Sequence, residues 1–148
     1  MRQPELQNLG KYELVREIGR GSMATVYLAR DPFALQDVAI KVAAHRADGD
    51  ERTNRRRRKL FYNESKAARL LRHPNIVATI DVGEDDGVRF IVMEYVPGAQ
   101  TLDKFCREPN LLPVENAIEV VLKCALAFDY AHANGVIHRD VKPKNILV

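Results

Sequence analysis

Short apolar runs between turn residues occupy the chain as far as residue 96, and these runs predict β-strands. Apolar and polar residues alternate in part of them, and the others are rich in β-branched and aromatic residues, as strands are. Glycines and Asp-Pro or Asp-Gly pairs separate the runs and indicate turns. We therefore expect five strands, at residues 12–18, 25–29, 38–42, 76–82 and 89–96, with a turn at 83–87 between the last two. Residues 1–10 lack this pattern and are expected to be a loosely held tail.

Two longer segments place apolar residues at helical spacing instead. The first runs from Asn54 to about Arg72, and one face of it carries Leu60, Glu64, Ala67, Ala68 and Leu71. The second runs from Val114 to Asn134, on the order of 30 Å, with proline just before it and glycine just after it. Its apolar stripe consists of Ala117, Ile118, Val121, Leu122, Ala125 and Phe128.

Smaller elements are expected around the second helix. Thr101 begins a short helix in which Thr101 or Asp103 is the cap. Val136-Ile137 is expected to be a short strand that leads into a polar loop. The β-branched, apolar residues 146–148 begin another strand after that loop.

The length and composition of the chain are typical of a soluble protein with a single domain. The chain has 148 residues, 46% of them hydrophobic, and a net charge of +3 from 23 basic and 20 acidic side chains. Its two cysteines, Cys106 and Cys124, lack metal-ligand spacing and fit a reducing compartment. No signal peptide and no run of about 18 apolar residues is present. We therefore expect a cytoplasmic location and no membrane span in this segment; an anchor beyond residue 148 stays open.

Glycines between the first two strands predict a phosphate-binding hairpin. The string from Gly19 to Ala24 precedes Thr25-Val26-Tyr27, which starts a strand well and a helix poorly. In a dinucleotide-binding unit the glycines would open a helix instead. Glycine lets backbone amides approach a phosphate closely. A Walker-type P-loop is excluded because its Gly-Lys-Ser/Thr ending is absent.

One lysine and one glutamate stand on apolar faces and are candidates for an ion pair. Lys41 follows Val38-Ala39-Ile40 in a strand that otherwise reads as buried. A cation among apolar neighbours is costly unless it meets an anion. Glu64 lies in the middle of the apolar face of the first helix and is the expected partner.

The last eleven residues combine three groups that phosphoryl transfer needs. Asp140 is able to accept a proton from a hydroxyl, Lys142 supplies positive charge, and the amide oxygen of Asn145 suits Mg²⁺. Pro143 lies among them and indicates a loop.

Together these stretches resemble the eukaryotic-type serine/threonine protein kinases, in particular their bacterial Hanks-type group, from Tyr12 to Val148. The glycine hairpin, the Val-Ala-Ile-Lys strand, the helix glutamate, the segment from Met93 to Gly98 and the His-Arg-Asp loop occur in the family's order. Two departures are Ala24 for the third glycine and Val141 for the usual leucine. Ala68, one turn after Glu64, is also smaller than the family's usual residue, and we expect it to loosen the contact between helix and sheet.

The resemblance implies an α+β, protein-kinase-like fold. It would have a tail at residues 1–11 and a five-stranded antiparallel N-lobe sheet with one regulatory helix at 12–93. A hinge at 94–98 and the beginning of a helical C-lobe at 99–148 would follow.

The resemblance also assigns roles to individual residues. The cofactors would be ATP and Mg²⁺, and the acceptors would be serine or threonine hydroxyls of proteins. The catalytic residues would be Asp140, Lys142, Asn145, Lys41 and Glu64, and Asn145 would hold a metal ion. The ATP site would comprise Ile18, Gly19, Arg20, Gly21, Ser22, Met23, Ala24, Val26, Ala39, Lys41, Met93, Glu94, Val96 and Leu147. His138 would be structural, and Arg139 would bind a phosphorylated loop.

Alternatives stay open beside this interpretation. No Asp-Phe-Gly string, and hence no second metal-binding carboxylate, occurs in the chain, so we expect it to be inactive alone. The rival is a non-catalytic kinase remnant that binds nucleotide or another kinase and regulates it. A second kinase copy also stays open as a dimer partner. Residues 52–59 carry six basic side chains; a solvated face is the favoured interpretation, with a phosphate, an acidic partner or nucleic acid as further options. Nucleic acid is not expected as a partner.

Overall fold

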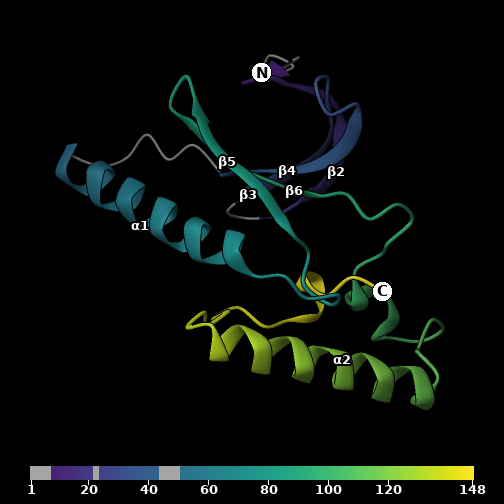
Figure 1. Ribbon diagram of the computed structural model, residues 1–148. Helices are drawn as coiled ribbons and strands as arrows, with labels where there is room; N and C mark the ends of the chain where they lie inside the picture. Colours follow the sequence, from purple (N-terminus) through teal and green to yellow (C-terminus); the bar gives the residue numbers. More distant parts are fainter. Residues whose placement is uncertain (1–7, 22–23, 44–50) are drawn as a thin grey trace. The chain divides into compact units, whose positions relative to one another are not determined.

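The computed structural model describes residues 8–21, 24–43 and 51–148 (Figure 1). For part of the first helix it describes the backbone alone, namely for Glu51, Thr53, Asn54, Arg56, Arg57, Arg58, Leu60, Glu64 and Ala67. The chain divides into two compact units, one with Met1–Leu70 and Val77–Tyr95 and the other with Leu71–Ile76 and Val96–Val148. Each unit is described by itself.

The first unit is built on an antiparallel sheet of six strands in the order β1-β2-β3-β4-β6-β5. The strands are β1 (Asn8–Leu9), β2 (Tyr12–Arg20), β3 (Ala24–Asp31), β4 (Gln36–Ala43), β5 (Thr79–Asp85) and β6 (Val88–Glu94). The expected count of five strands is wrong by one, because β1 pairs with the start of β2. Residues 8 and 9 therefore do not belong to a loose tail. Gly10 has φ +57°, which lets the chain turn back, and Leu9 is 1% exposed.

One face of this sheet carries the hydrophobic core. β4 is central and contributes three core residues, Val38, Ile40 and Val42. The rest of the core cluster is Leu9, Tyr12, Ala29, Phe90 and Val92. Burying such side chains stabilises a fold by roughly 1.5–3 kcal/mol each, so the sheet is the most firmly held part of the first unit.

The β5–β6 hairpin has a tighter turn than the expected five residues at 83–87. Its strands continue to Asp85 and resume at Val88. The two turn residues, Asp86 and Gly87, have φ 46° and 77°, as type I′ turns require. The turn is short because Gly83 pairs opposite Phe90 and stays in the strand.

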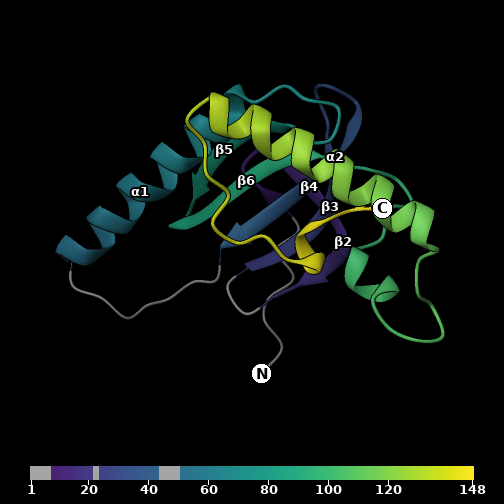
Figure 2. The ribbon, with the colours of Figure 1, turned by 90° about the horizontal axis from the view of Figure 1, so that it is seen from below.

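The helix of the first unit, α1 (Glu51–Leu70), begins three residues before the predicted Asn54. It packs against β5, the strand at one edge of the sheet (Figures 1 and 2). An ion pair of 3.6 Å between Arg69 Nη1 and Asp81 Oδ1 joins its last turn to β5.

The second unit is built on α2 (Val114–Ala133), which confirms the predicted long helix. Gly135 has φ +74°, and the Val136 amide donates to the Ala131 carbonyl at 2.9 Å, as in a Schellman cap. Residues 136–137 were expected to be a strand, and this expectation is wrong because Val136 belongs to the helix cap.

The apolar stripe of α2 is largely exposed. The exposed fractions are 62% for Ile118, 68% for Val121 and 58% for Leu122, whereas Ala127 and Ala131 on the same helix are buried. Only a small part of the apolar surface of α2 is therefore buried within the second unit.

Short contacts complete the second unit. The hydroxyl of Tyr130 on α2 accepts the Arg72 amide at 3.1 Å, and the Tyr130 ring contacts that of His73. Residues 71–76 thus pack on α2. The 3₁₀ helices are η1 (Leu102–Phe105) and η2 (Pro143–Asn145). Thr101 precedes η1 but makes no side-chain cap bond, so its expected capping bond is absent.

No helix in the described parts of the chain is long and apolar enough to cross a membrane.

Candidate active site

The loop before η2 brings the three predicted catalytic groups of the second unit into direct contact. Lys142 Nζ lies 2.7 Å from Asp140 Oδ2. The Asn145 side-chain amide donates to the same Oδ2 at 3.0 Å and to the Asp140 carbonyl at 2.8 Å. Pro143 opens η2, and its carbonyl and that of Lys142 accept the amides of Ile146 and Asn145, so the turn itself sets this spacing.

The backbone on the N-terminal side of Asp140 is held by His138. His138 Nδ1 accepts the Asp140 amide at 3.2 Å, and its ring lies edge-on to Phe128 of α2. Arg139 between them has φ 62°, an uncommon backbone conformation for a residue with a side chain. These contacts match the structural role expected for His138, although its side chain is exposed.

The electrostatics of this loop favour an ionised Asp140. Hydrogen bonds from Lys142 and then Asn145 lower the pKa of the Asp140 carboxyl below its usual value. The carboxyl is therefore a carboxylate at neutral pH. An exposed carboxylate in this form is able to accept a hydrogen bond from an incoming hydroxyl.

Asn145 offers an amide oxygen to a metal ion in this loop. The hydrogen bonds of its side chain to Asp140 both use the nitrogen, so neither of them occupies the oxygen. Within the described ranges, no three His, Cys, Asp or Glu side chains gather as a metal site. The donor set thus fits the role of Asn145 as one ligand among several.

The register of the sheet brings four predicted nucleotide-site residues onto one face. Val26 pairs with Lys41, and Ala39 pairs with Met93. Ala39 and Lys41 are two residues apart, and direct partners in antiparallel strands share a face. All four therefore lie on the face opposite the core. Ile91, which was not predicted from the sequence, lies on the same face because it pairs with Lys41 two positions before Met93.

The glycine hairpin is described except for Ser22 and Met23, so the prediction for these two residues lies outside the described part. The Gly21 amide donates to the Ala24 carbonyl at 2.8 Å and closes the turn. Arg20 forms a bidentate ion pair with Glu17. The hydrogen bonds of this pair lower the pKa of Glu17 and raise the pKa of Arg20. The predicted site residue Arg20 is thus held along β2 by a residue that the sequence analysis missed.

Two glycines in this hairpin have no local structural need to be glycine. A Cβ built on Gly19 would lie 3.9 Å from the Val26 Cβ, and one on Gly21 would lie 3.6 Å from the Ala24 carbonyl oxygen. Both are ordinary contacts, and neither glycine has positive φ. The other described glycines either have positive φ or, at Gly83, lie against a ring. Neither the backbone conformation nor the packing of a Cβ therefore explains these glycines, whereas a ligand that lies close to the backbone would require them.

The remaining predicted residues are placed as follows. Glu64 lies in α1, but its side chain is outside the described part, so the Lys41–Glu64 pair stays a prediction; Lys41 is exposed. Ile18 lies at a bulge in β2. The Glu94 amide already donates to the Ala78 carbonyl at 2.9 Å, so only its carbonyl suits the role expected toward a base. Val96 and Leu147 belong to the second unit, where Leu147 bridges to Thr101.

Comparisons with known proteins match nearly the whole chain. Residues 12–148 match the family described as Protein kinase domain. The serine/threonine-protein kinase PrkC of Bacillus subtilis is 40% identical over 139 residues, which are 94% of this chain and 21% of PrkC. PknF of Mycobacterium tuberculosis is 42% identical over 140 residues, which are 93% of this chain and 28% of PknF. The chain thus spans less than a third of either relative.

A solved structure supports the same fold. The crystal structure of the Mycobacterium tuberculosis PknI kinase domain superposes with a TM-score of 0.79 at 36% identity. The match covers 100% of this chain and 59% of that one. The sheet, α1 and α2 therefore have counterparts in a known kinase domain.

Proposed function

The chain belongs to the protein kinase domain family, and from this premise we propose that it supplies the ATP-binding and catalytic-loop part of a serine/threonine protein kinase. The reaction would transfer the γ-phosphate of ATP to a serine or threonine hydroxyl of a protein. The observation that carries this proposal is the loop in which Asp140 contacts both Lys142 and Asn145, at 2.7 and 3.0 Å.

Asp140 would orient the acceptor hydroxyl and accept its proton. Its lowered pKa keeps it ionised at neutral pH, so the carboxylate is ready without a prior proton loss. Lys142 Nζ lies beside that carboxylate and would meet the negative charge of a phosphate brought to the same place.

The first unit would bind the nucleotide. Val26, Ala39 and Met93 offer apolar contacts on the face that also bears Lys41. Lys41 would bind the α- and β-phosphates and be oriented by Glu64, and the backbone at Gly19 and Gly21 would approach phosphate closely because neither residue has a side chain. Asn145 would hold Mg²⁺ by its amide oxygen; the ion, when bound, neutralises phosphate charge.

The acceptors and location complete the proposal. Lysine two residues after Asp140 is typical of the serine/threonine branch and not of tyrosine kinases, so serine and threonine hydroxyls of proteins are the proposed acceptors. Cys106 and Cys124 are both free, and Cys106 is exposed. Free thiols suit a reducing, cytoplasmic compartment, where ATP is also available.

Two measurements on the purified chain test the proposal. The first is the binding of a fluorescent ATP analogue with Mg²⁺, which should saturate. The Lys41→Met variant should weaken this binding at least about tenfold, the effect of losing a charge-assisted contact of about 1.4 kcal/mol. Arg30→Met removes an exposed cation that pairs with Asp37 on the same sheet, and it should leave binding unchanged.

The second measurement is the transfer of labelled γ-phosphate to a serine- and threonine-rich protein. Transfer that Asp140→Asn abolishes would establish the catalytic role. Binding without transfer is the result expected of this chain by itself, because it contains no Asp-Phe-Gly string, and it agrees both with the proposed function and with the rival regulatory module. Failure of the unmodified chain to bind any adenine nucleotide would contradict both.

A further inference from the structure

The residues just before the matched kinase region are built into the first unit. We call Asn8–Tyr12 the N-terminal clasp; all but Tyr12 precede the family match, which begins at residue 12. Leu9 and Tyr12 are 1% and 2% exposed and belong to the core cluster. The Gly10 amide donates to Asp85 Oδ2 at 2.7 Å, across 75 residues of chain. The clasp is therefore held by β5 as well as by β2.

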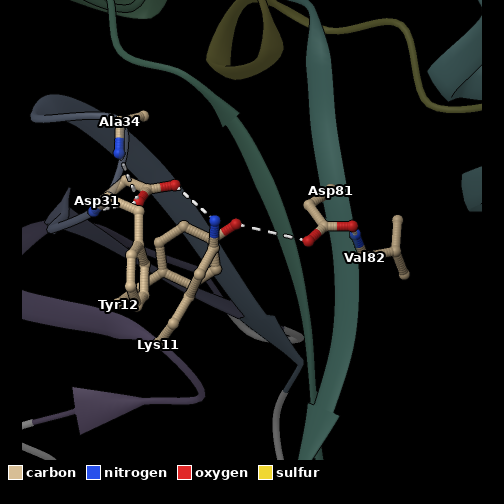
Figure 3. Close-up of polar contacts among 7 residues, drawn as sticks. Lys11, Tyr12, Asp31, Ala34, Asp81 and Val82 are labelled. Atoms are coloured by element: carbon tan, nitrogen blue, oxygen red, sulfur yellow. Dashed lines mark hydrogen bonds and ion pairs between the residues drawn. The ribbon is translucent and has the colours of Figure 1, made fainter.

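A nearly buried carboxylate anchors the middle of the clasp. Lys11 Nζ lies 2.7 Å from Asp31 Oδ2, and the Asp31 side chain is only 5% exposed (Figure 3). Asp31 also accepts the amides of Phe33 and Ala34 at 2.9 and 3.1 Å. These bonds lower the pKa of Asp31, the lysine bond contributing most, and the same pair raises the pKa of Lys11. The anchor fixes the residue next to Tyr12.

Tyr12 connects the clasp to α1 through a single carboxylate. Its hydroxyl donates to Asp81 Oδ2 at 3.4 Å, and Figure 3 shows the ring pointing across to Asp81. The other oxygen of Asp81 accepts the Val82 amide at 2.9 Å and lies 3.6 Å from Arg69 Nη1 in the last turn of α1. Asp81 lies at the register shift of β5, where the strand is irregular. Its side-chain direction therefore depends on these partners.

We propose that Tyr12, Asp81 and Arg69 are positioning residues that transmit the state of the N-terminal clasp to α1. Arg69 lies five residues after Glu64 on the same helix. When the clasp is bound to β5, the Tyr12 hydroxyl keeps Asp81 oriented toward Arg69, and the Arg69–Asp81 contact holds α1 against β5. When the clasp is displaced, Asp81 loses the Tyr12 hydrogen bond, and the contact between α1 and β5 becomes weaker. The consequence for the Lys41–Glu64 pair, and so for ATP, rests on the proposed function.

Hydrogen–deuterium exchange of the α1 amides at residues 61–70 tests the proposal directly. Tyr12→Phe keeps the buried ring and removes only the hydroxyl, and Arg69→Gln removes the cation from the helix. Each should speed exchange in this segment about fivefold, a coupling of ordinary size for groups in one network. The double variant should exchange little faster than the faster single variant, because both act through Asp81.

Matched controls separate this effect from general loosening. Tyr27→Phe removes a hydroxyl from a tyrosine that packs on the same core. Arg30→Gln breaks the ion pair between Arg30 of β3 and Asp37 of β4, two strands that do not pair with β5. Neither should change exchange in α1. Unchanged exchange in Tyr12→Phe, or effects of Tyr12→Phe and Arg69→Gln that simply add, would overturn the proposal.

The binding of the ATP analogue to the same variants gives the second readout. If the clasp positions the Lys41–Glu64 pair, Tyr12→Phe and Arg69→Gln should each raise Kd severalfold with the same non-additivity. Absence of binding by the unmodified chain would contradict the proposed function, but the exchange data would still test whether the clasp acts on α1. Normal nucleotide binding with no coupling in exchange would defeat the clasp alone.

Discussion

At the scale of single residues, Asp140 shows how two neighbours prepare a carboxylate. Lys142 contributes the larger effect and Asn145 the smaller, and both favour the charged form. Because the pKa is lowered on folding, the contact stabilises the folded chain above the pKa of Asp140 in the unfolded chain. This stabilisation disappears as pH falls through the lower, folded-state pKa.

We predict that Lys142→Met raises the pKa of Asp140 toward its usual value. The shift is upward because the variant removes the main group that favours the carboxylate. The measurement is a titration of the Asp140 side-chain carbon by NMR. Lys144→Met, two residues further along the chain in η2, removes an equal charge and leaves the contacts of Asp140 with Lys142 and Asn145 in place. An equal shift in both variants would show that net charge, and not the contact, sets the pKa.

At the scale of elements, the β5–β6 hairpin depends on the close approach of a ring to a glycine. A Cβ on Gly83 would lie 2.4 Å from Cζ of Phe90, and Phe90 is 5% exposed in the core. The ring cannot move away freely, because it also packs edge-on to Tyr12. Glycine at position 83 is therefore a packing requirement and not a turn signal.

We predict that Gly83→Ala lowers the free energy of unfolding by roughly 1–3 kcal/mol, the cost of overpacking a core. Urea unfolding followed by circular dichroism measures the change. Gly19→Ala is the control, since a Cβ there meets its nearest neighbour at 3.9 Å. A Gly83→Ala variant within about 0.5 kcal/mol of the unmodified chain would mean that Phe90 adapts, contrary to this packing argument.

At the scale of the whole molecule, the exposed side of α2 dominates the expected behaviour in solution. Val114, Ile118, Val121, Leu122 and Leu126 are each more than half exposed. A contiguous apolar face of this kind marks a contact surface.

We predict that the chain self-associates through this face. Sedimentation velocity at tens of micromolar should show oligomers, and Ile118→Lys combined with Leu122→Lys should convert most of the material to monomer. Lysine is a good helix former, so the variant should keep α2. Phe33→Lys alters an isolated apolar residue that is 79% exposed in a turn, and it should leave association unchanged. A monomeric unmodified chain would contradict the prediction.

Several features followed from the sequence because their causes are local. Helical spacing with Pro113 before and Gly135 after it was enough for α2, and residue types at short spacing were enough for the Asp140, Lys142 and Asn145 loop. A short apolar run interrupted by one charge also placed the strand that carries Lys41. These signals depend on neighbours within a few turns of helix or a few positions of strand.

Tertiary structure alone decided the features that depend on pairing between distant segments. The register set Lys41 beside both Val26 and Ile91, and a one-residue slip would have turned it to the core face. Leu9 looked like part of a tail because its burial comes from the sheet and not from its neighbours in sequence. Tyr12 and Asp81 are 69 residues apart, and no local pattern records that the hydroxyl of one reaches the carboxylate of the other.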